Sequence, residues 1–238
     1  DVDAVISAVG STLGALPARG EAPAPLAGSD QRRFPAPAEA PVRLTHTGPA
    51  NQALGFVAWP TRDQIGDRTE ARQLTILADV LQLRLNDEIR EKRGLAYSPN
   101  AGSTASDVFP GYGYLAVTAE TPPEELTTLF QAVDAIAADL RDRPVEADEL
   151  NRARLPAVER LRRNQADNGY WLGQLSQAQS DPQALDQIRS NVQDLESVTP
   201  ADIQRLAQAY LKPETAWQAE IVSSQPATAA APAAPAAR

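Results

Sequence analysis

An arginine and a tyrosine stand seven positions apart in the segment L-N-D-E-I-R-E-K-R-G-L-A-Y-S, which spans residues 85–98. Arg90 lies in the predicted last turn of a helix, and Tyr97 lies on the strand predicted after a turn at Gly94. A chain reversal at that glycine brings a guanidinium and a phenol to one edge of a sheet. Both groups donate hydrogen bonds, which suit a peptide carbonyl or a developing oxyanion. Spacing alone, however, favours a simpler interpretation over a binding site. In it, Arg90 belongs to a solvated helix end and Tyr97 fills the core.

The sequence lacks the residues that a zinc or serine hydrolase needs. His46 is the only histidine, and there are no cysteines. A catalytic zinc requires about three protein ligands, usually with two imidazoles among them, so neither H-E-x-x-H nor H-x-x-E-H can occur here. No G-x-S-x-G elbow accompanies the histidine either. We therefore interpret His46 as structural or exposed, and we predict no metal or cofactor site in this chain.

Composition excludes further classes of function. The formal net charge is -9, which argues against a nucleic-acid partner because phosphate binding needs a basic face. No run of about 18 apolar residues exists, so the sequence predicts no membrane span. The chain contains no methionine and begins at Asp1, which favours a natural N-terminus further upstream.

Four regions follow one another along the chain. Residues 1–16 have helical apolar spacing, which predicts a stub helix that belongs to a preceding domain or packs back across a domain boundary. Residues 17–41 hold six prolines, which predicts a surface linker poorly tied to the core. Residues 42–223 form the folded domain. Residues 224–238 are almost all alanine and proline at their end, and we expect them to be disordered.

The folded domain alternates strand and helix signals. Strands are predicted at 42–47, 53–59, 95–104 and 112–120, with a last one around Trp217. A helix capped by Asp67 carries one apolar stripe, made of Leu74, Leu77, Leu81 and Leu85. Further helices are predicted after Thr121 and over 146–179, 182–195 and 200–211. This order predicts an α+β fold in which helices cover one face of a mostly antiparallel sheet.

Residues 88–98, E-I-R-E-K-R-G-L-A-Y-S, resemble the pitrilysin/insulinase family of zinc metallopeptidases, in the half that lacks the metal. The similarity continues at Gly55-Phe56, at 113–117, at 145–150 and at 198–203, and so covers residues 42–223. It implies the repeat fold shared by pitrilysin and the mitochondrial processing peptidase, in which residues 1–16 resemble the last helix of a preceding repeat.

The resemblance also implies a function. In that family an Arg-x6-Tyr pair of the metal-free half contacts substrate and stabilises the tetrahedral intermediate, and Arg90 and Tyr97 match it. Arg93 is a rival for the arginine role, and the spacing favours Arg90. The chain would then be the non-zinc half of a zinc metalloendopeptidase that acts on peptides or unfolded protein. The zinc would lie in an upstream domain or a partner subunit, and this chain alone would be inactive.

Two other functions stay open. Some family members have lost catalysis, so the chain could be a non-catalytic structural or assembly module, although such members have degenerate pairs. A stand-alone peptide-binding domain is a third hypothesis. A periplasmic location is implied by resemblance to bacterial relatives only.

Overall fold

The computed structural model describes residues 1–18, 20, 24, 26–29, 31–96, 98–178 and 184–225. The chain divides into two compact units, Asp1–Gln31 and Arg32–Arg238. The predicted tail therefore falls outside the described residues from position 226 onward.

The first unit holds helix α1 (Val2–Ser11) and a 3-10 turn (Leu13–Ala15). Asp1 caps the helix by accepting a hydrogen bond from the Asp3 backbone N–H at 3.0 Å. No residue of α1 is buried within this unit. Its assignment to a preceding repeat stays a prediction.

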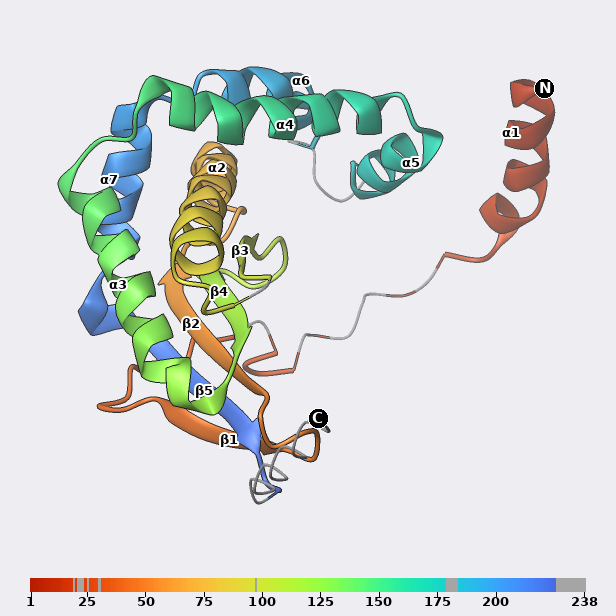
Figure 1. The fold of residues 1–238 in the computed structure, drawn as a ribbon. Helices are drawn as coiled ribbons and strands as arrows, with labels where there is room; N and C mark the ends of the chain where they lie inside the picture. The colour runs from red at the N-terminus through yellow and green to blue at the C-terminus, as the bar shows by residue number, and fades with distance from the viewer. Residues whose placement is uncertain are drawn as a thin grey trace, which may run out of the picture. The chain divides into compact units, whose positions relative to one another are not determined.

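The second unit is built on a five-stranded sheet with the order β1-β5-β2-β4-β3 (Figure 1). Its strands are β1 (Val42–His46), β2 (Ala53–Thr61), β3 (Asn100–Ala105), β4 (Gly113–Thr121) and β5 (Trp217–Ser223). Only β1 and β5 pair in parallel among these strands, and the other three pairings are antiparallel. The mostly antiparallel α+β fold is therefore confirmed.

Helices follow the strands as α2 (Arg68–Leu85), α3 (Leu126–Asp142), α4 (Ala147–Gln165), α5 (Asn168–Gln177), α6 (Ala184–Glu196) and α7 (Pro200–Tyr210). A π-helical turn η2 (Asn86–Lys92) extends α2, and 3-10 turns occupy Pro123–Glu125 and Pro213–Thr215. The stretch predicted as one helix over 146–179 is two helices. Asp167 separates them, because its side chain accepts from the Gly169 N–H at 2.7 Å and caps α5. None of the helices that the structure describes is both long and apolar enough to cross a bilayer.

One face of the sheet carries the core. Alternate residues of β2, including Val57 and Trp59, are buried on the side that α3 covers. A Cβ at Gly55 would lie 2.6 Å from Leu129, so glycine permits this close helix packing. All four leucines of the predicted α2 stripe are fully buried, which confirms that amphipathic face.

The other face of the sheet, which we call the open face, is more exposed. Leu54 and Phe56 of β2 lie there half-buried, opposite Glu120 and Thr118 of β4 in the antiparallel register. Phe56 also makes an edge-on ring contact with Trp217 of β5.

The linker is held more firmly than the sequence predicts. The Arg32 guanidinium lies 4.9 Å from the ring centroid of Tyr112, and the Phe34 ring lies 6.1 Å from that of Tyr114. The expectation that residues 17–41 are poorly tied to the core is therefore wrong for these two side chains. The cause is a set of aromatic partners in the β3–β4 hairpin, which linker composition does not reveal.

Candidate functional site

The predicted site begins where α2 widens into the π turn η2, which carries Arg90. Ile89 anchors this turn because its side chain is fully buried in the core. Gly94 ends the turn with a φ of +63°, a left-handed conformation that favours glycine. The Leu95 N–H then donates to the Ile89 carbonyl at 3.0 Å and closes the reversal. Such π turns are frequent at functional sites.

The two candidate arginines have different environments. Glu88 accepts hydrogen bonds from Lys92 at 3.1 Å and from Arg93 at 2.8 Å, and these bonds hold the pKa of the Glu88 carboxyl below its usual value. Among the described residues, Arg90 is paired only with its sequence neighbour Glu91, at 3.2 Å, and its side chain is 47% exposed. Arg93 is thus engaged within the turn, whereas Arg90 is open to an incoming group.

Tyr97 lies outside the residues that the structure describes, so its meeting with Arg90 stays a prediction. The strand predicted over 95–104 starts later than expected, since β3 begins at Asn100 and Leu95 lies outside it. The Leu95 carbonyl instead accepts a hydrogen bond from the buried Thr121 hydroxyl at 2.7 Å. This bond holds the segment against the end of β4.

A glutamine of α2 holds the chain on the far side of residue 97. The Gln82 amide nitrogen donates to the Pro99 carbonyl at 2.9 Å, and its oxygen accepts from the Ala101 N–H at 2.7 Å. The same nitrogen lies 3.1 Å from the Asn86 side-chain oxygen at the start of the π turn. Gln82 thus links both ends of the segment, a role that a polar position in a helix does not signal in the sequence.

A pocket of about 350 Å³ opens next to this segment. Its lining residues are Leu54, Ser98, Thr118, Ala119 and Glu120. Leu54 and Glu120 lie opposite each other on β2 and β4, and Ser98 precedes the strand whose first residue pairs with Thr118. No sequence pattern marks this pocket, because its residues come from three segments that only the strand register brings together.

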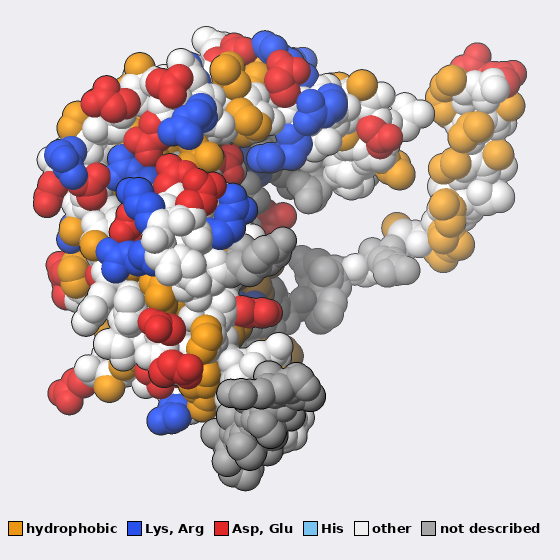
Figure 2. Space-filling view, in the orientation of Figure 1, with side chains coloured by type: hydrophobic (Ala, Val, Ile, Leu, Met, Phe, Trp, Pro, Cys, Tyr) orange, Lys and Arg blue, Asp and Glu red, His pale blue; other side chains and the backbone are white. Residues whose placement is uncertain are grey.

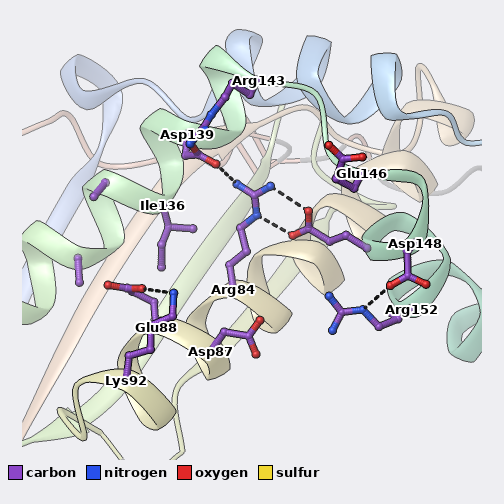
Figure 3. A pocket seen from close by; sticks show the side chains of 13 residues that line it. Arg84, Asp87, Glu88, Lys92, Ile136, Asp139, Arg143, Glu146, Asp148 and Arg152 are labelled. Atoms are coloured by element: carbon purple, nitrogen blue, oxygen red, sulfur yellow. Dashed lines mark hydrogen bonds and ion pairs between the residues drawn. The ribbon is translucent and has the colours of Figure 1, made fainter.

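A larger cleft of about 830 Å³ lies between η2, α3 and the start of α4 (Figure 3). The Arg84 guanidinium points between two carboxylates there, with contacts of 2.7 and 3.0 Å to Glu149 and 2.6 Å to Asp139. Lys92 pairs with Glu88 on the opposite wall. Arg84 thus connects α2 to α3 and α4 beside the turn that carries Arg90, although the cleft as a whole is lined by six acidic and four basic side chains. Figure 2 shows the same pattern more widely, with acidic and basic side chains interspersed over this face of the helices.

The chain's residues do not fit a catalytic zinc. Among the described ranges, no group of three or more His, Cys, Asp or Glu side chains could hold a metal ion. The single histidine is committed elsewhere: His46 Nδ1 accepts from the Gly48 N–H at 2.9 Å, and Nε2 contacts the Gln52 carbonyl at 3.0 Å. The described part of the site therefore offers Arg90 as a hydrogen-bond donor and no set of metal ligands.

The chain matches one protein family and several solved structures. The family model described as the peptidase M16 inactive domain matches residues 1–155. No curated protein sequence matches the chain. Among solved structures, a protease from Helicobacter pylori has a TM-score of 0.74 at 15% identity and covers 95% of this chain and 53% of its own.

Two further structures share the fold. The periplasmic protease PqqL from Escherichia coli has a TM-score of 0.70 at 16% identity, over 94% of this chain and 24% of its own. A peptidase M16 inactive domain from Pseudomonas fluorescens has a TM-score of 0.63 at 19% identity, over 82% of this chain and 48% of its own. The chain thus spans between about a quarter and about half of the length of these three structures.

Proposed function

The chain belongs to the peptidase M16 inactive-domain family, and on that premise we propose that it is the metal-free half of a zinc metalloendopeptidase. In this role it helps to bind a peptide or unfolded protein segment and stabilises the tetrahedral intermediate. The zinc site lies in a complementary half, either upstream in the same polypeptide or in a partner subunit. The observation that carries the proposal is the exposed Arg90 on its anchored π turn, inside a segment that resembles the pitrilysin-type motif.

Each proposed residue has a separate task. Arg90 binds a backbone carbonyl of the substrate, since its guanidinium has several donors and no acceptor. Tyr97 donates its hydroxyl hydrogen to the oxyanion that forms during attack. The zinc of the complementary half, when bound, supplies the activated water.

The surroundings of Arg90 favour such a contact. Its present partner Glu91 is 61% exposed, and exposed ion pairs contribute only about 0.2–1 kcal/mol. A substrate carbonyl can therefore replace or join that partner at little cost. Arg93 would first have to leave Glu88, which it shares with Lys92.

Substitution of the two arginines in the complete peptidase tests the proposal. A charge-assisted hydrogen bond contributes about 1.5–3 kcal/mol, so Arg90→Met should lower kcat/KM about tenfold or more, with a raised KM. Arg93→Met serves as the matched control and should stay within about twofold of the parent enzyme. An unchanged kcat/KM in Arg90→Met would remove the catalytic role and favour a structural or assembly module instead.

We also propose that α1 is the last helix of a preceding repeat. Its apolar residues Val2, Val5, Ile6 and Val9 are 48–73% exposed and recur at helical spacing, so they fit a packing surface supplied by another domain. Ile6→Asp should therefore destabilise a longer protein that includes the upstream residues, and leave the unfolding of this chain unchanged. Equal effects on both proteins would argue against the assignment.

A periplasmic location is supported by the likeness to a protease described as periplasmic. Fractionation of cells that express the complete protein tests it directly. Recovery in the cytoplasmic fraction would contradict it.

A further inference from the structure

The small pocket on the open face has the chemistry to recognise one kind of side chain. Leu54 supplies an aliphatic surface, and Ser98 and Thr118 supply hydroxyl groups. Among the lining residues that the structure describes, Glu120 is the one with a charge. The pocket therefore combines an apolar wall with a single negative charge.

Glu120 carries that charge without compensation. The residue is exposed, and it has no ion-pair or hydrogen-bond partner among the described residues. Its cross-strand neighbour on β2 is Leu54, which offers no counter-charge. By contrast, the carboxylates of the large cleft beside Arg84 are engaged by arginine.

We propose that this pocket receives a lysine or arginine side chain of the peptide substrate. Such a side chain lays its methylene stem on an apolar surface and keeps its cationic end at a polar one. Leu54 would contact the stem, Glu120 would pair with the ammonium or guanidinium, and the hydroxyls of Ser98 and Thr118 would accept its remaining N–H groups. The pocket therefore selects for a basic residue and against an acidic one.

The position of the pocket connects it to the proposed reaction, and in this respect the inference rests on the proposed function. Ser98 follows Tyr97 in the chain and lines the pocket. A peptide whose reacting carbonyl is bound by Tyr97 would pass the pocket within a few residues of the scissile bond. One substrate position should therefore show the preference, and the others should not.

The test uses the complete peptidase and quenched fluorescent peptides that differ at one position. Lysine, norleucine and glutamate are placed in turn at each of the positions around the scissile bond. Norleucine has the stem of lysine without its charge, so the ratio of kcat/KM values isolates the ion pair. A partly exposed ion pair is worth up to about 1 kcal/mol, so we expect lysine to be preferred about three- to fivefold at one position. Added salt should weaken that preference.

Variants of this chain assign the preference to the pocket. Glu120→Gln should abolish the lysine preference, so that the lysine and norleucine peptides are cleaved with equal kcat/KM. Glu120→Lys should reverse it in favour of the glutamate peptide. Glu124→Gln is the matched control, since it removes an equal charge from an exposed residue close in sequence that does not line the pocket. It should keep the full lysine preference.

The outcomes separate this inference from the proposed function. A preference that persists in Glu120→Gln, or that is absent at every position in the parent enzyme, overturns the pocket assignment. If Arg90→Met lowers kcat/KM as expected while Glu120→Gln changes nothing, only the pocket assignment fails. If Glu120→Gln abolishes the lysine preference while Arg90→Met keeps the full kcat/KM of the parent enzyme, the pocket assignment is supported and the proposed role of Arg90 is wrong.

Discussion

Replacing Arg84 by methionine should destabilise the domain more than any other single loss of charge near the large cleft. Methionine keeps most of the stem and removes the guanidinium, which makes three contacts of 2.6–3.0 Å to Asp139 and Glu149. The Arg84 side chain is 18% exposed and that of Glu149 is 15% exposed. The variant therefore leaves a largely buried carboxylate without its cation.

The magnitude follows from that burial. Breaking a buried ion pair by removing one partner costs about 3–5 kcal/mol, and the open cleft beside Arg84 lets water offset part of this cost. We therefore expect a loss of about 3 kcal/mol in the free energy of unfolding. For a domain of this size the loss corresponds to a fall in Tm of about 6–12 °C.

Urea and thermal unfolding of the chain measure the effect, with Arg143→Met as the control. Arg143 also pairs with Asp139, but its side chain is 74% exposed, so its loss should cost no more than about 0.5 kcal/mol. The double variant Arg84→Met with Glu149→Leu should recover most of the stability, because it removes the stranded charge. Equal small effects of Arg84→Met and Arg143→Met would refute the reasoning from burial.

Three further predictions concern the fold. A Cβ at Gly113 would clash with the Arg62 carbonyl oxygen, so Gly113→Ala should lower the free energy of unfolding by about 1–3 kcal/mol in a urea titration. Gly102→Ala is the control and should be nearly neutral, because a Cβ at Gly102 would meet no atom within 4 Å. Phe34→Ala should speed limited proteolysis within residues 32–41, and an unchanged cleavage rate would show that the ring contact does not hold the linker. Burial raises the pKa of the Asp79 carboxyl, so the folded state binds the carboxyl proton more tightly than the unfolded state does. The contribution of Asp79 to stability therefore falls as pH rises from the ordinary aspartate pKa of about 3.9 through the raised pKa of the folded state. Asp79→Asn should therefore stabilise the chain at pH 7 but not at a pH below the ordinary aspartate pKa of about 3.9. An equal change in the free energy of unfolding at these two pH values would contradict the burial argument.

The sequence predicts those parts of the fold that local chemistry determines. The cap at Asp67 and the buried leucine stripe of α2 follow from side-chain hydrogen bonding and helical period. The α+β class follows from the order of strands and helices. The cap and the stripe each depend on residues close together in the chain, and the class depends only on the order of the elements.

Contacts between distant residues were not predictable in the same way. The π turn depends on burying Ile89 while Leu95 bonds back to it, and no periodicity marks such a turn. Linker anchoring by Phe34 depends on Tyr114 of β4. The pocket at Glu120 requires the register of β2 and β4 and the path of Ser98, so its chemistry emerges only when the sheet is assembled.

The most direct test of the proposed role is the kcat of Tyr97→Phe in the complete peptidase. Phenylalanine keeps the ring and removes only the hydroxyl that we assign to the oxyanion. Loss of one such donor typically lowers kcat by about 10²–10³, so we expect a fall of that size with KM and Tm little changed. Tyr114→Phe, which removes a phenolic hydroxyl from the open face of the sheet, should leave kcat unchanged. A Tyr97→Phe enzyme with the full kcat of its parent would contradict the claim that this metal-free chain takes part in catalysis through that residue.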